Sequence, residues 1–157
     1  MTIKGLGDQS RAARRLPPGT RVAIEGPYGA FTRHARAYDR VALIGAGVGI
    51  TPLRALLEDL PDGTDVVVIV RASTVDDLVH RDEVTALVRR RGGRLYEVVG
   101  SRRRVRFDAH VLRRLVPDLA VRDVYICGPN GFGASVIDAA LRLGVAGEQI
   151  HQEAFEF

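Results

Sequence analysis

Apolar runs separated by stretches of helical periodicity organise the chain from about residue 40 onward. The pattern predicts strands over 41–44, 66–70, 94–99 and 124–127, and a short last strand over 149–155. Several of these runs are apolar at consecutive positions, which is typical of strands buried on both faces of a parallel sheet. Because helical segments alternate with the strands, we predict an α/β fold, a doubly wound parallel five-stranded sheet of the Rossmann-like type.

Start and stop signals predict the helices between these strands. We expect a helix from about Thr51 to Asp59, a helical stretch near His80–Arg91, a helix capped by Asp108 and reaching Leu115, and a helix ending near Leu143. Pro61, Gly63 and Pro117 lie where the first and third of these helices must end.

The first 37 residues differ from the rest. Ser10 is a plausible N-cap for a short helix. The remaining pattern predicts a strand end over 2–4, that helix over 11–16, a half-buried strand over 21–25 and a polar linker over 33–39. Two strands and one short helix cannot bury an independent core. We therefore divide the chain into residues 1–37, a lid or a remnant of another domain, and residues 38–157, the α/β domain.

Composition bounds the classes of protein to consider. The chain has 157 residues, 46% hydrophobic and 27% charged, as expected of one soluble globular domain. No stretch approaches the roughly 18 apolar residues of a membrane helix, and the first residues do not form a signal peptide. The single cysteine, Cys127, excludes an internal disulfide and a four-thiolate zinc or iron–sulfur site, so no metal site is expected. We expect a cytoplasmic protein.

The net charge of +4 comes almost entirely from arginine, because Lys4 is the only lysine. The runs Arg89–Arg91 and Arg102–Arg104 are not interleaved with aromatic residues that would stack on bases, so we expect no nucleic-acid partner. Solvated surface charge explains both runs. A nucleic-acid or acidic partner bound through Arg102–Arg106 stays open as an alternative.

The strongest local signal is the glycine-rich turn after the first buried strand. The stretch Gly45-Ala46-Gly47-Val48-Gly49-Ile50-Thr51-Pro52 leads from that strand into a helix. Glycines let the backbone approach a pyrophosphate, and the amides of the helix N-terminus favour its charge. The spacing departs from the common dinucleotide fingerprint, because Ile50 stands where a third glycine would fall. The alternative is a tight structural turn.

Arginine and hydroxyl side chains follow the second strand, where the ribose specificity of dinucleotide-binding proteins is usually set. Arg71 and Ser73 suit a 2′-phosphate, which a guanidinium binds with two parallel hydrogen bonds. Arg81 would supply a second charge. These residues favour NADP(H) over NAD(H). The alternative for Arg71 is a surface salt bridge.

Cys127, Gly128 and Pro129 end the fourth strand. Taken alone, Cys127 is a small buried hydrophobe. The alternative is that it lines the cleft at the carboxyl end of the sheet, where Gly128 and Pro129 shape a turn that admits a flat ring.

Three motifs in this order resemble the ferredoxin–NADP⁺ reductase superfamily: Gly-Ala-Gly-Val-Gly-Ile-Thr-Pro, Cys-Gly-Pro-Asn-Gly-Phe and the terminal Ile150–Phe157. The branch they are most similar to is the reductase module of bacterial ferric-reductase-like and NADPH-oxidase-like proteins. The resemblance covers essentially the whole chain and implies cofactor-binding residues as well as catalytic ones. It assigns the nucleotide pyrophosphate to Gly45, Gly47, Gly49, Thr51 and Pro52, the 2′-phosphate to Arg71 and Ser73, the nicotinamide to Cys127, Gly128 and Pro129, and the flavin face to Glu153 and Phe155. Phe157 is an alternative to Phe155.

The resemblance also implies a flavin domain before the nucleotide domain. Gly7 and Ser10 fit the turn that receives the FAD pyrophosphate, and Gly26–Phe31 is similar to the exit of an antiparallel FAD-binding β-barrel. The family's R-x-Y-S/T flavin motif and most barrel strands are absent. We therefore expect an N-terminally truncated or naturally short relative whose FAD site is incomplete in this chain.

The implied reaction is hydride transfer from NADPH to FAD, followed by single-electron transfer to a haem, ferric iron or a protein acceptor. The acceptor is unknown, and a membrane haem domain or subunit is one candidate. With such a partner, we expect this cytoplasmic chain to lie at the cytoplasmic face of the membrane. The alternative is a non-catalytic NADP(H)-binding module without a working flavin site.

Overall fold

The computed structural model describes residues 7–23, 31–101 and 107–155. The chain divides into two compact units, Met1–Gly29 with Phe157, and Ala30–Glu156. The first unit contains helix α1 (Asp8–Ala12), which continues as a 3₁₀ turn over Ala13–Arg15.

Two expectations for the first unit are wrong. Ser10 is not an N-cap, because α1 begins at Asp8 and includes it; the Ser10 hydroxyl instead accepts from Gly7 N at 2.9 Å and donates to Gly7 O at 3.0 Å. Residues 21–23 are in no strand, and Val22 is 56% exposed, because no neighbouring described segment pairs with them. The remainder of that expected strand, the strand end over 2–4 and the turn over 26–30 lie outside the described residues.

The second unit is built on a five-stranded parallel sheet. Its strands are β1 (Arg40–Ala46), β2 (Asp65–Ala72), β3 (Arg94–Val99), β4 (Asp123–Pro129) and β5 (Ile150–Phe155). The order across the sheet is β3-β2-β1-β4-β5, and every neighbouring pair is parallel. The α/β fold and the five strands are confirmed, with boundaries that differ by one or two residues.

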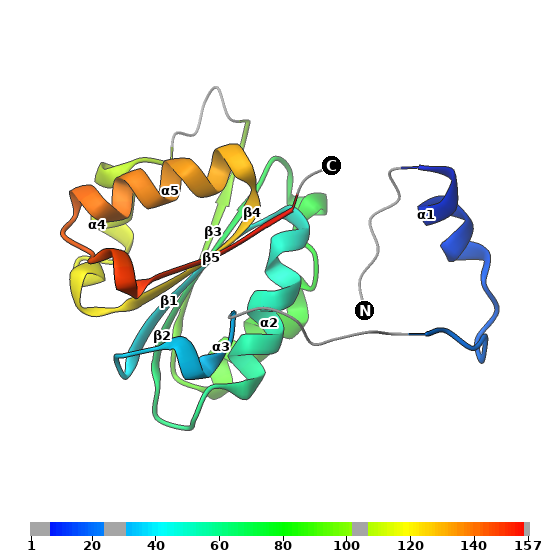
Figure 1. Ribbon diagram of the computed structural model, residues 1–157, viewed down its shortest axis with the longest axis horizontal. Helices are drawn as coiled ribbons and strands as arrows, with labels where there is room; N and C mark the ends of the chain where they lie inside the picture. Colours follow the sequence, from blue (N-terminus) through cyan, green and yellow to red (C-terminus); the bar gives the residue numbers. More distant parts are fainter. Residues whose placement is uncertain (1–6, 24–30, 102–106, 156–157) are drawn as a thin grey trace. The chain divides into compact units, whose positions relative to one another are not determined.

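Helices cover both faces of this sheet. They are α2 (Ile50–Asp59), α3 (Arg81–Arg90), α4 (Ala109–Leu115) and α5 (Asn130–Arg142). The helices α2 and α3 lie on one face, and α4 and α5 on the other (Figure 1). Asp108 caps α4 as expected, because its side chain accepts from the amides of His110 and Val111.

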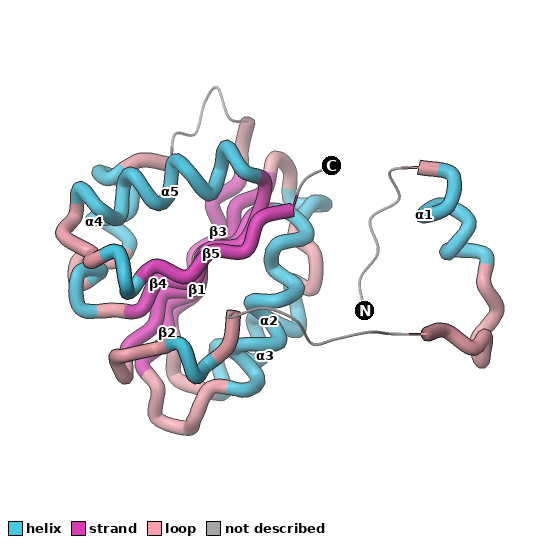
Figure 2. Tube along the Cα trace, viewed as in Figure 1, coloured by secondary structure: helices cyan, strands magenta, loops and turns pink. Residues whose placement is uncertain are grey.

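Strand alternation divides the apolar core into two clusters. On β1, Val41 and Leu43 pack under α2 and α3, whereas Ala42 and Ile44 pack under α4 and α5. All four side chains are fully buried. Figure 2 shows the consequence, a strand layer between two helical layers. The continuous apolar runs of the sequence follow from this burial on both faces.

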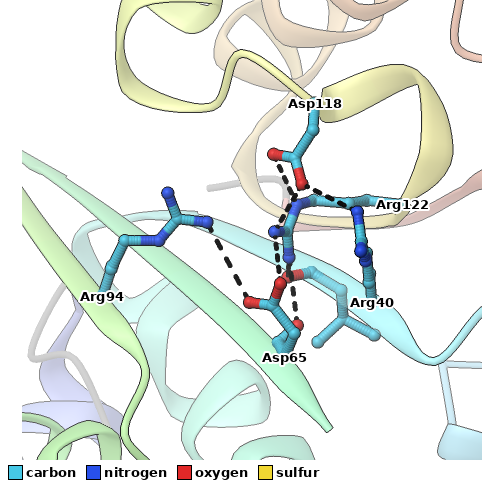
Figure 3. Close-up of polar contacts among 6 residues, drawn as sticks. Arg40, Asp65, Arg94, Asp118 and Arg122 are labelled. Atoms are coloured by element: carbon cyan, nitrogen blue, oxygen red, sulfur yellow. Dashed lines mark hydrogen bonds and ion pairs between the residues drawn. The ribbon is translucent and has the colours of Figure 1, made fainter.

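A network of charged side chains crosses the edge of the sheet where the strands begin (Figure 3). Arg122 is fully buried and contacts Asp118 and Asp65 at 2.7 and 2.8 Å. Its guanidinium also donates to the carbonyl oxygens of Asp65 and Val41. Arg40 lies 3.5 Å from Asp118. The paired carboxylates and carbonyls satisfy the buried cation, and the network joins the start of β1, β2 and β4.

The segment expected to be a polar linker, with the neighbouring Thr32, is held against β4. Buried Asp123 accepts from the amides of Ala37 and Tyr38 at 2.9 and 2.7 Å, and its other oxygen lies 3.1 Å from His151 Nε2. The Tyr125 hydroxyl donates to Thr32 O at 2.9 Å. Backbone groups of this segment are thus partners of two buried strand residues.

Candidate functional site at the carboxyl edge of the sheet

The carboxyl ends of all five strands meet at one edge, and the chain leaves β1 and β4 there in opposite directions. From β1 it passes through α2 to β2, and from β4 through α5 to β5, on the other side of the sheet. Open α/β sheets bind ligands in the crevice outside such a switch point. The predicted glycine turn follows β1, and the predicted Cys-Gly-Pro turn ends β4, so the topology brings these two motifs together.

The three glycines of the turn have different roles. Gly49 lies so close to β4 that an added Cβ would stand 2.2 Å from the Cys127 carbonyl oxygen and 2.9 Å from Gly128 N. A Cβ at Gly45 would stand 2.7 Å from Leu53 Cδ1. Gly47 has φ +57° and would meet no atom within 4 Å. Gly45 and Gly49 therefore permit close packing, while Gly47 provides the left-handed backbone and leaves open space beside the turn.

The start of α2 holds a buried hydroxyl that lacks a partner. Thr51 lies in the first turn of α2, and its Oγ1 is inaccessible to solvent and makes no hydrogen bond within the described chain. Buried polar atoms are normally hydrogen-bonded, so an orphaned one is a candidate ligand contact. Pro52 also lies in this first turn, where its missing N–H is tolerated. The open space at Gly47, the orphaned hydroxyl and the helix N-terminus suit an anionic group such as a pyrophosphate.

Cys127 is fully buried in the apolar cluster under α2 and α3. Burial, with a smaller contribution from the charge of Glu153, raises the pKa of its thiol to about 12. A thiol in this environment is not a nucleophile at neutral pH. Its backbone, rather than its sulfur, adjoins the glycine turn, through the contact with Gly49.

The turn after Cys127 is tightly packed. A Cβ on Gly128 would stand 3.0 Å from the ring of Phe132 and 3.2 Å from Ala46 Cβ. Pro129 is the last residue of β4 and directly precedes α5. Glu153 and Phe155 lie opposite Cys127 and Pro129 in the β4–β5 register, so the terminal motif also reaches the carboxyl edge. Phe157 lies outside the described residues.

Arg71 is not presented to solvent, and this differs from both of its expected roles. It is 7% exposed, and its guanidinium donates to the carbonyl oxygens of Ala72, Val98 (3.2 Å) and Gly100 (2.5 Å). A guanidinium buried in this way does not present the accessible fork that a phosphate needs. Ser73 is exposed just after β2.

Arg81 opens α3 and is paired with a residue that the sequence reasoning missed. Its Nε and Nη2 each lie 2.8 Å from a carboxylate oxygen of Glu97 on β3. Hydrogen bonds with Arg81 lower the pKa of Glu97, and the same contacts raise the pKa of Arg81. The sequence holds one indication of this pairing, because Glu97 is a charged residue between the apolar neighbours of a predicted strand. Strand alternation places Arg71 on the α4–α5 face, whereas Arg81 begins a helix of the other face, so the two arginines do not form one cluster.

Gly7 and Ser10, expected at a flavin pyrophosphate, belong to the first unit and contact each other as described above. Arg102–Arg106, the basis of the alternative basic partner site, lies outside the described residues. Of the helices that the structure describes, none has the length and apolar character needed to span a membrane.

An open parallel sheet with a glycine turn and an orphaned hydroxyl at its switch point defines a doubly wound nucleotide-binding domain. The family model of the oxidoreductase NAD-binding domain matches residues 43–137. The chain belongs to this family, within the ferredoxin–NADP reductase superfamily.

Curated relatives include reductases. The chain is 31% identical to ferredoxin–NADP reductase B of Sorangium cellulosum, over 96% of this chain and 68% of that protein. It is 31% identical to an NADPH oxidoreductase of Mycobacterium tuberculosis, over 99% of this chain and 42% of that protein.

Solved structures share the fold. The cytochrome b5 reductase domain of Ulva prolifera nitrate reductase matches with a TM-score of 0.75 at 19% identity, over 94% of this chain and 64% of that one. Flavohemoglobin from Malassezia yamatoensis, solved with bound FAD and heme, matches with a TM-score of 0.73 at 21% identity, over 99% of this chain and 43% of that one. The chain thus spans 42% to 68% of the length of these four proteins.

Proposed function

We propose that the chain binds NADP(H) at the carboxyl edge of its sheet and serves as the nucleotide-binding part of a flavin-dependent reductase. The observation that carries this proposal is the orphaned Thr51 hydroxyl in the first turn of α2, directly after the glycine turn. When bound, NADPH supplies a hydride, and FAD accepts it and releases single electrons onward.

The roles of the protein residues in this proposal are to bind and to orient. The backbone of Gly47 and Gly49 and the Thr51 hydroxyl hold the pyrophosphate, with Gly45 and Pro52 fixing the turn. The backbone of Cys127, with Gly128 and Pro129, forms the floor under the nicotinamide. Glu153 is the polar group at the reacting end, and Phe155 is the aromatic residue proposed for the flavin face.

The preference for NADP(H) over NAD(H) is part of the proposal. A ferredoxin–NADP reductase and an NADPH oxidoreductase among the relatives support it. Ser73, exposed at the end of β2, is the proposed hydroxyl contact to the 2′-phosphate. Arg81 is half exposed and supplies positive charge near the edge, shared with Glu97.

The second part of the proposal concerns FAD and the electron acceptor. Gly7 and Ser10 are proposed to face the FAD pyrophosphate. Flavohemoproteins of Bordetella and the reductase subunit of a glycine betaine monooxygenase from Pseudomonas aeruginosa are among the relatives and support the proposed class of acceptor. We propose a haem or an oxygenase component as the acceptor, carried by a membrane domain or by a separate subunit.

An absorbance spectrum and an activity assay test this proposal. In purified chain supplied with FAD, a bound flavin band near about 450 nm together with NADPH oxidation by ferricyanide would support a working reductase module. Saturable NADPH binding without bound flavin or turnover would instead identify a non-catalytic NADP(H)-binding module. Absence of NADPH binding would overturn both.

A further inference from the structure

The buried guanidinium of Arg71 joins the carboxyl ends of β2 and β3. Its Nη1 donates to Ala72 O and Val98 O, and its Nη2 donates to Gly100 O at 2.5 Å. The planar fork of an arginine can hold several acceptors in fixed positions, which a lysine ammonium cannot do.

Gly100 completes a closed hydrogen-bond ring. Its amide donates to Ala72 O at 3.1 Å, so Ala72 O accepts from both the backbone of Gly100 and the side chain of Arg71. Gly100 has φ +147°, a conformation that residues with a side chain rarely adopt. The direction in which the chain leaves β3 toward exposed Ser101 is therefore set by Arg71 and by the backbone of Gly100.

This position matters because the adenosine half of a dinucleotide lies over the ends of the strands next to the glycine turn. We infer that Arg71 is a positioning residue, which fixes the ends of β2 and β3 as a floor for the adenosine and does not itself contact the 2′-phosphate. The inference rests on the proposed function, since it requires a nucleotide at this edge. It replaces the direct phosphate contact expected for this arginine.

The two half-cofactors 5′-AMP and 2′,5′-ADP separate the roles, because they differ only in the 2′-phosphate. Calorimetric titration of the full chain is expected to show that Arg71→Gln and Arg71→Lys each weaken both ligands about tenfold, the equivalent of one lost charged hydrogen bond, with the ratio of the two affinities unchanged. Arg142→Gln is the matched control, because the Arg142 side chain is 72% exposed and pairs with Asp138. It should leave both affinities unchanged.

Other outcomes would overturn either the inference or the proposed function. Weakening of 2′,5′-ADP alone would assign Arg71 to the phosphate, and unchanged affinity for both ligands with a lowered melting temperature would make it purely structural; each overturns the inference. Failure of the unaltered chain to bind either ligand would overturn the proposed function instead.

A second measurement needs no stable variant. In the ¹⁵N-arginine-labelled unaltered chain, the Arg71 guanidinium resonance should be the same in the 5′-AMP and 2′,5′-ADP complexes. A shift specific to 2′,5′-ADP would contradict the inference.

Discussion

Gly49 packs against the Cys127 carbonyl so closely that a Cβ on Gly49 would stand 2.2 Å from the carbonyl oxygen. This contact joins the turn after β1 to the end of β4, the two strands between which the chain reverses its direction across the sheet. The glycine in the pyrophosphate-like motif is therefore required by the fold at this point, as well as by any ligand.

Gly49→Ala is expected to destabilise the protein by about 1–3 kcal/mol, because the backbone of the turn or of β4 must shift. Urea unfolding measures the effect. Gly147→Ala is the control, since a Cβ there meets no atom within 4 Å, and its effect should stay below about 0.5 kcal/mol. Equal stability of the two variants would show that the turn can move away from β4 freely.

The Cys127 thiol should be inert in the folded protein. Its pKa of about 12 lies well above the ordinary 9.0, so the thiolate fraction at pH 8 is about a thousandfold below that of an exposed cysteine. A disulfide reagent at pH 8 should react at the rate of unfolding and stoichiometrically in urea. Rapid reaction of the native chain would place the sulfur in an open cleft.

Two aspartate–arginine pairs at i,i+4 spacing should differ in their contribution to stability. Asp118→Asn should cost about 2 kcal/mol, because Arg122 is fully buried and loses a charged partner. Asp138→Asn should cost about 0.5 kcal/mol or less, because both members of the Asp138–Arg142 pair are exposed. Urea midpoints at pH 7 compare the two variants, and equal losses would contradict the role of burial.

Asp118 should also contribute to acid unfolding. Hydrogen bonds from Arg122 lower the pKa of Asp118 below its ordinary 3.8, against the opposing effect of burial. The stabilisation is fully present above the ordinary value and is lost as the pH falls through the lower folded value. The Asp118→Asn variant should therefore lose less stability than the unaltered chain between pH 7 and strongly acidic pH. Equal losses of stability in the two proteins over this pH range would contradict this assignment.

The sequence predicts the sheet well because burial on both faces leaves continuous apolar runs, as at Val66–Val70. It also predicts the Asp108 cap, which is a local interaction. The first unit was harder to predict from the sequence, since Ser10 lies inside α1 and bonds back to Gly7, the residue before the helix. Local spacing cannot decide such competition between hydrogen-bond partners.

Arg71 and Arg81 show a second limit of prediction from the sequence, which concerns contacts between strands. Arg71 was expected at a phosphate, but its partners Val98 on β3 and Gly100 just after β3 are 27 and 29 residues away. The partner of Arg81, Glu97, is 16 residues away on that same strand. Contacts between strands depend on register and on the face of the sheet, and a single sequence does not specify either one.

The central claim is that a nucleotide binds at the carboxyl edge of the sheet, and amide NMR of the full chain titrated with NADP⁺ tests it most directly. Saturable shifts are predicted at Gly47, Gly49, Thr51 and Gly128. Shifts gathered instead around Arg122 at the opposite edge, or no saturable shifts, would contradict the account.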